Sequence, residues 1–174
     1  SKFLMPLVHS FTLSKKKGNE AWVEPHFFSD GSVSYEVHYG GKPKIEGTVV
    51  RSGAHCACCD TAVPLDYIRQ EGRNGRIGSQ LMAIVAEGKN KRIYLPANVE
   101  HIRAAAISKP ENYPSGKLSG KCRVNVSLYG FDETSDLFTN RQLTALTTFS
   151  SLVAEAQKKT TEDAVKAGMR NDYA

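Results

Sequence analysis

The stretch from Asp136 to Val153, DLFTNRQLTALTTFSSLV, carries the strongest helix signal in the chain. Thr139 is a favourable N-terminal cap, and Gln142 three residues later completes the S/T-x-x-E/Q pattern of a capping box. Apolar residues then recur at spacings of three and four, which places them on one helical face: Leu143, Leu146, Phe149, Val153 and Ala156. The pattern predicts a helix from about Asn140 to Lys158, with a second helical piece reaching Ala167.

We expect this apolar stripe to be buried against a small core, as is usual for an amphipathic helix. Truncation of Leu146 or Phe149 to alanine is then expected to cost roughly 2–5 kcal/mol of stability, the range for buried large-to-small substitutions.

The rest of the chain favours antiparallel strands before this helix. Alternating or β-rich segments predict strands over residues 3–13, 21–28, 32–39, 46–51, 80–86, 91–95 and 121–128. Residues 60–79, which are polar and contain three glycines, suggest a mobile loop, and residues 98–108 suggest a short helix. The order predicts an α+β fold in a single domain over residues 1–174, mainly β up to residue 128 and with a helical arm over 136–168.

Composition limits the class of protein. The chain has 174 residues, which suits one domain, and 40% of them are hydrophobic, which is enough to build a core. It has no run of about 18 apolar residues, so no membrane span is predicted. The start, SKFLMPLVHS, has no long apolar segment of the secretory kind. The net charge of +5 is compatible with nucleic acid as a partner but is weak support alone.

The cysteines are crowded rather than spread. Three of the four, Cys56, Cys58 and Cys59, lie within four residues, and Cys122 stands apart. This is a poor framework for disulfides, and close cysteines without an export signal more often bind metal or stay reduced. We therefore expect a cytoplasmic protein.

The cysteine cluster contains a C-x-x-C pair, Cys56 and Cys59, whose spacing lets two thiolates bind one tetrahedral zinc ion from a tight turn. A structural zinc site needs four ligands, and the chain has no second C-x-x-C pair. The further candidates for ligands are His55, Cys58, Cys122 and His9. The pattern leaves two alternatives open, a bound zinc ion or a zinc-knuckle-like turn with free thiols.

Basic residues concentrate between Arg69 and Arg123, a segment that contains eleven basic and four acidic residues. Because phosphate contacts supply most non-specific affinity for nucleic acid, this bias suggests a DNA-binding surface. The candidate contacts are Arg69, Arg73, Arg76, Lys89, Lys91 and Arg92, and Tyr94 and Tyr113 are candidates for stacking on bases. An ordinary solvated surface is the alternative.

Four blocks of sequence are familiar as a set: MPLVHSFTLSKKKG from Met5, CACC with PLDYIR from Cys56, LMAIVAEGKNKRIYLP from Leu81, and YGFDETSDLFTNRQLTALTTFSSLVAEA from Tyr129. In this order they resemble a family of large adenine-specific DNA methylases that carry an inserted zinc ribbon. The resemblance covers most of the chain. It implies DNA as a partner, and a larger protein of which this chain is an internal segment beside a flanking methyltransferase domain.

The resemblance also implies two catalytic elements, a glycine-rich loop for S-adenosylmethionine and a D-P-P-Y-type motif for the adenine amino group. Neither is present, because Gly72, Gly75 and Gly78 do not form G-x-G-x-x-G and no D-P-P-Y occurs. We therefore expect S-adenosylmethionine to bind only the full-length enzyme. The chain itself is expected to be a non-catalytic domain that positions DNA or braces the methyltransferase core. The alternatives are an independent enzyme with a thiol or metal centre at Cys56–Cys59, and a structural protein-interaction module.

Overall fold

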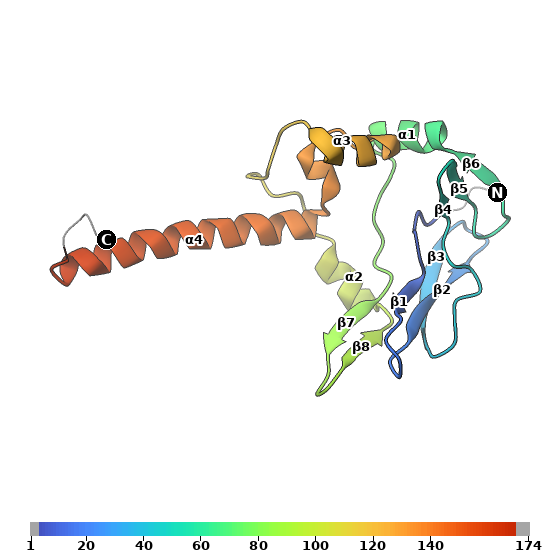
Figure 1. Cartoon of the computed structure of the whole chain (residues 1–174), viewed down its shortest axis with the longest axis horizontal. Helices are drawn as coiled ribbons and strands as arrows, with labels where there is room; N and C mark the ends of the chain where they lie inside the picture. The colour runs from blue at the N-terminus through green and yellow to red at the C-terminus, as the bar shows by residue number, and fades with distance from the viewer. Residues whose placement is uncertain (1–3, 170–174) are drawn as a thin grey trace. The chain divides into compact units, whose positions relative to one another are not determined.

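The computed structural model describes residues 4–169 and has the predicted α+β class, with small antiparallel sheets followed by a long helix (Figure 1). The chain divides into two compact units, each of which is described by itself. The first contains the chain up to Ala105 together with Ser119–Asp132, and the second contains Ala106–Leu118 and the chain from Glu133 onward.

The first unit is built around a three-stranded antiparallel sheet of β1 (Thr12–Ser14), β2 (Ala21–Phe27) and β3 (Val33–Tyr39), paired in that order. Its core contains Phe11, which directly precedes β1, and Val23 of β2, and both side chains are fully buried. The predicted β2–β3 hairpin is confirmed, and the Asp30 carboxylate accepts a hydrogen bond from the Ser32 N–H in its turn. The predicted strand over 3–13 is limited to β1, and its first residue, Phe3, lies outside the described residues.

A second small sheet contains β4 (Val49–Val50), β5 (Gly53–His55) and β6 (Ala62–Pro64). The predicted strand over 46–51 is therefore present only at its end. The segment before it is held by Thr48, whose buried hydroxyl donates to the Pro6 carbonyl and accepts from the Val8 N–H. These bonds satisfy buried backbone groups that have no sheet partner.

The prediction of a loop over residues 60–79 is wrong for its central part, which forms α1 (Leu65–Arg73). The three glycines suggested a loop, but Gly72 lies inside the helix. A Cβ on Gly72 would lie 1.9 Å from the Tyr129 carbonyl oxygen, so glycine allows the backbone at Tyr129 to pass directly against α1. Tertiary packing, including the burial of Ile68, therefore stabilises a helix that local propensity disfavours.

The strand predicted over 121–128 is also wrong. This segment forms α3 (Gly120–Val126) and the 3₁₀ turn η1 (Ser127–Tyr129). Its valines alternate with polar residues, but a strand needs a neighbour for its backbone groups, and no described strand pairs with it. A helix satisfies those groups locally, as in the bond from the Arg123 N–H to the Ser119 carbonyl.

The remaining elements of the first unit follow the sequence. The predicted hairpin is present as β7 (Ile84–Glu87) and β8 (Arg92–Leu95), although its first strand begins later than expected. The short helix near 98–108 is present as α2 (Val99–Ala105).

The second unit contains the 3₁₀ turn η2 (Thr134–Leu137) and α4 (Asn140–Lys166), a single uninterrupted helix rather than two pieces. The capping box is confirmed. The Gln142 N–H donates to the Thr139 hydroxyl, and the Thr139 N–H donates to the Gln142 side-chain oxygen at 2.8 Å. Within residues 4–169, no helix combines the length and the apolar character that crossing a bilayer requires.

The burial predicted for the α4 stripe is wrong for most of it. Leu143 is 1% exposed, but Leu146 is 46%, Phe149 is 70% and Val153 is 69% exposed. The spacing of apolar residues predicts a face, yet burial also requires a neighbouring surface, and among the described residues of α4 only Leu143 is buried. Truncation of Leu146 or Phe149 is therefore not expected to cost the roughly 2–5 kcal/mol that applies to buried residues.

Candidate nucleic-acid interface and candidate metal centre

The β7–β8 hairpin is anchored on the first sheet by one pair of tyrosines. The Tyr39 hydroxyl donates to the Tyr94 carbonyl at 2.8 Å and accepts from the Tyr94 N–H at 2.6 Å. The two rings lie tilted with centroids 6.5 Å apart, and Tyr94 is buried. The structure therefore uses Tyr94 as an anchor, and its ring is not available to stack on a base as the sequence suggested.

The other stacking candidate belongs to the second unit. The ammonium of Lys109 lies 3.8 Å from the centroid of the Tyr113 ring, in a cation–π contact. This contact covers one face of the tyrosine.

The basic turn between β1 and β2 lies directly beside the β7–β8 hairpin. The chain between β1 and β2 carries Lys15, Lys16 and Lys17, all exposed, and ends in Asn19, which is buried. The Asn19 side-chain amide donates to the Arg92 carbonyl at 3.0 Å, which joins this turn to β8. The sequence shows a run of lysines, but it does not show that residues 73 positions apart are neighbours.

Six exposed basic residues are therefore gathered in the β1–β2 turn and at the tip of the β7–β8 hairpin, including the first residue of β8, and we call this set the basic double turn: Lys15, Lys16, Lys17, Lys89, Lys91 and Arg92. Among the ion pairs of residues 4–169, none involves a member of this set. The acidic residue Glu20 follows the lysine turn in the sequence, and Glu87 is the cross-strand partner of Arg92. The double turn is a concentrated positive surface, which attracts polyanions.

The three predicted arginine contacts differ from this set because each has a carboxylate partner. Arg69 lies 2.9 Å from Asp66, and Arg73 lies 3.8 Å from Asp132. Arg76 donates two hydrogen bonds to Glu71, which lower the pKa of that carboxyl below its ordinary value. Each of these three charges therefore has a carboxylate neighbour within the first unit.

The C-x-x-C pair lies in the turn between β5 and β6. The Cys56 N–H donates to the Thr61 carbonyl at 2.9 Å, and the Asp60 N–H donates to the Cys56 carbonyl at 2.8 Å. Asp60 follows Cys59 with φ of 56°, in the left-handed region that Asp tolerates better than most residues. These features form a tight knuckle with Cys58 to Thr61 exposed at its tip.

Hydrogen bonds within the knuckle affect the pKa of the Cys59 thiol. The Cys59 sulfur lies 3.1 Å from the Thr61 hydroxyl oxygen. Hydrogen bonds from Thr61, first from its hydroxyl and then from its backbone, lower the pKa of the Cys59 thiol, and a hydrogen bond with the Cys56 thiol adds to this effect. Thiolates are among the donors that zinc prefers.

The wider set of predicted ligands does not complete a site. Within residues 4–169, no three His, Cys, Asp or Glu side chains lie where they could hold one metal ion. His55 faces Asp60, with its Nδ1 atom 3.4 Å from a carboxylate oxygen, and neither Cys58, Cys122 nor His9 supplies a third ligand beside the pair. The described residues therefore do not supply the four ligands of a tetrahedral structural zinc site.

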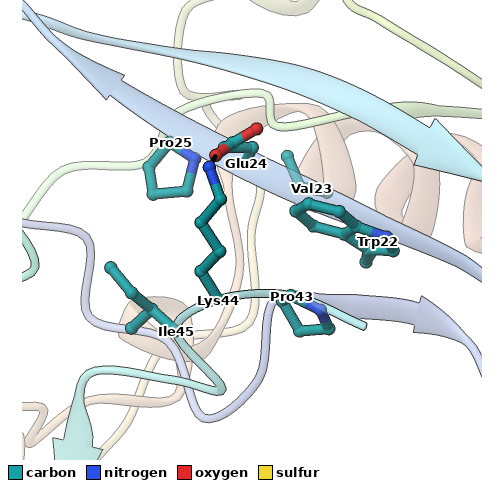
Figure 2. A pocket seen from close by; sticks show the side chains of 7 residues that line it. All are labelled: Trp22, Val23, Glu24, Pro25, Pro43, Lys44 and Ile45. Carbon is teal, nitrogen blue, oxygen red and sulfur yellow. Dashed lines mark hydrogen bonds and ion pairs between the residues drawn. The ribbon is translucent and has the colours of Figure 1, made fainter. Parts of the chain in front are cut away.

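A shallow pocket beside β2 is a less suitable candidate. It is lined by Trp22, Val23, Glu24, Pro25, Pro43, Lys44 and Ile45, and has a volume of about 60 Å³ (Figure 2). Lys44 and Glu24 form an ion pair of 2.7 Å across it, which lowers the pKa of Glu24 and raises that of Lys44. Ligand pockets are typically several hundred Å³. This pocket is too small for a cofactor, and its carboxylate is already paired.

Comparison of the chain with protein-family models, with curated proteins and with solved structures gave no match. The resemblance to the adenine-specific DNA methylases therefore stays a prediction from the four sequence blocks.

Proposed function

We propose that this chain is a non-catalytic domain of an adenine-specific DNA methyltransferase, works in the cytoplasm, and positions duplex DNA for the catalytic core. The link to a methyltransferase rests on the four sequence blocks. The observation that carries DNA binding is the basic double turn, in which the contact between Asn19 and Arg92 joins two sets of exposed cations.

The physical fit to a duplex comes from the shape and anchoring of the hairpin. The major groove of B-DNA admits a two-stranded β-ribbon, and the flanking phosphates lie within reach of side chains at its tip. The tyrosine pair fixes the hairpin at β8, so the cations at the tip are presented on an ordered support. Binding through phosphates positions the protein without reading sequence.

Neutralising one turn at a time tests this assignment. In Lys89→Gln/Lys91→Gln/Arg92→Gln, the slope of log affinity against log salt should flatten by up to about 2.7, since each phosphate contact contributes about 0.9. Lys15→Gln/Lys16→Gln/Lys17→Gln should flatten it similarly. The measurement is fluorescence anisotropy of a labelled duplex over a salt series.

A third variant, Arg69→Gln/Arg73→Gln/Arg76→Gln, is the matched control because it removes the same charge from paired positions. It should leave the slope nearly unchanged. If this control flattens the slope and the two double-turn variants do not, DNA contacts α1 and the assignment to the double turn is wrong. Circular dichroism of all three variants checks that each is folded.

The chain should neither bind S-adenosylmethionine nor transfer a methyl group to DNA, because it contains no glycine-rich cofactor loop and no D-P-P-Y-type motif. Isothermal titration with S-adenosylmethionine and a radiolabel transfer assay on adenine-containing duplexes measure both properties. Transfer by the purified chain, retained after removal of traces of other methyltransferases, contradicts a non-catalytic role.

A second role, bracing the methyltransferase core, is favoured by the α4 stripe. Three members of the stripe, Leu146, Phe149 and Val153, are each between 46% and 70% exposed on one long helix. Helices in proteins gain most of their stability from packing an amphipathic face. We propose that a flanking methyltransferase domain supplies the surface that α4 packs against.

A further inference from the structure

Tyr39, the last residue of β3, presents an aromatic ring at the surface of the first unit. Its ring is tilted against that of Tyr94, yet Tyr39 is 52% exposed, whereas Tyr94 is only 7% exposed. The Tyr39 hydroxyl donates to the Tyr94 carbonyl and accepts from the Tyr94 N–H. The phenol is therefore held at its far end, and these two bonds fix a half-exposed ring in place.

Tyr39 lies between the two parts of the basic double turn. In the first sheet it pairs with Ala21, which is two residues after Asn19 at the end of the β1–β2 turn. On the hairpin it is bonded to Tyr94, which is two residues after Arg92 in β8. Two residues of an extended chain span roughly 7 Å. The exposed ring is therefore a close neighbour of both sets of cations.

An exposed aromatic ring among cations is the arrangement with which proteins bind single-stranded nucleic acid. The cations contact the phosphates, and an unpaired base of any kind has a flat face that stacks on the ring. The bases of a duplex are already stacked on one another, so a duplex offers Tyr39 phosphates but no free base face. The ring therefore favours a single strand over a duplex.

We propose that the basic double turn also binds single-stranded DNA, with one unpaired base stacked on Tyr39. This inference rests on the proposed contacts between the double turn and DNA phosphates, and it adds the class of strand that gains a further contact. Because its hydroxyl is already bonded, the ring loses little side-chain entropy when a base stacks on it. The sequence suggested Tyr94 for stacking, but Tyr94 is buried, and its exposed partner performs this role.

Two substitutions that both remove the hydroxyl isolate the contribution of the ring. Tyr39→Phe keeps an aromatic face and Tyr39→Leu does not, so a loosened hairpin is common to both variants. In fluorescence anisotropy, Tyr39→Leu should bind labelled oligothymidylate about 5- to 150-fold more weakly than Tyr39→Phe, the range for one base–aromatic stack. The two variants should bind a labelled duplex equally. Tyr67→Leu, at an exposed tyrosine of α1, is the matched control and should change neither affinity.

An abasic strand of the same length supplies the same phosphates without base faces. The unmodified chain should bind it more weakly than oligothymidylate, whereas Tyr39→Leu should bind both strands alike. The comparison with the unmodified chain tests the proposal even if a variant does not fold, which circular dichroism detects.

The outcomes separate this inference from duplex binding by the double turn. Equal affinity of Tyr39→Phe and Tyr39→Leu for oligothymidylate would overturn the stacking contact, while salt-dependent binding of the duplex would still support the double turn. An equal loss of single-strand and duplex affinity in Tyr39→Leu would also overturn it, because the ring would then not distinguish the strands. If neither DNA binds at low salt, both proposals are wrong.

Discussion

Replacing Leu143 with alanine should lower the free energy of unfolding by about 2–5 kcal/mol, the range for truncation of a buried leucine. Leu143 is 1% exposed, and it lies in the first turn of α4, where the capping box begins the helix. Its truncation removes apolar contacts and leaves a cavity at the helix start. Urea unfolding followed by circular dichroism measures the loss.

Phe149→Ala is the matched control on the same helix. Phe149 is 70% exposed, so its loss should change stability by no more than about 0.5 kcal/mol, as for other surface substitutions. If Phe149→Ala costs as much as Leu143→Ala, the stripe is covered in the isolated chain, and the proposal that a flanking domain packs on it is wrong.

Gly72→Ala should also be strongly destabilising, by about 1–3 kcal/mol or more, as for other overpacked positions. A Cβ at this position would lie 1.9 Å from the Tyr129 carbonyl oxygen and 3.1 Å from the Gly130 Cα atom. Both neighbours are backbone, so α1 and η1 must separate to admit the methyl group. In an unobstructed helix the same change would stabilise by up to about 1 kcal/mol, which makes the sign of the effect diagnostic.

Gly78→Ala provides the comparison, because nothing lies within 4 Å of a Cβ added there. Its effect should be neutral or slightly stabilising, since alanine restricts the unfolded chain more than glycine does. Thermal unfolding of the two variants under one condition compares them. Equal stability of Gly72→Ala and Gly78→Ala would contradict the close approach of Tyr129 to α1.

The parts of the fold that depend on residues close together in the sequence could be predicted from the sequence. The capping box at Thr139 and the hairpin turn at Asp30 each depend on a few adjacent side chains, and both are present. The sequence did not predict α1, because Gly72 lowers the local helix propensity. Glycine is needed at this position because the Tyr129 backbone, 57 residues away in the sequence, packs against it.

The candidate sites also differ in whether local or long-range contacts determine them. The C-x-x-C spacing places Cys56 and Cys59 in one knuckle, as the local pattern indicates. The association of the lysine turn with the β7–β8 hairpin depends on one long-range hydrogen bond from Asn19, which no local pattern reports. Likewise, the spacing in α4 identifies the apolar face but not whether anything covers Phe149.

The most direct test of DNA positioning is the affinity of the unmodified chain for a labelled duplex, measured by fluorescence anisotropy from low to physiological salt. The account predicts binding with little sequence preference, a dissociation constant on the order of 10⁻⁴ to 10⁻⁶ M at physiological salt, and a linear fall of log affinity with log salt. Absence of binding at low salt and high protein concentration would contradict a role for this chain in contacting DNA.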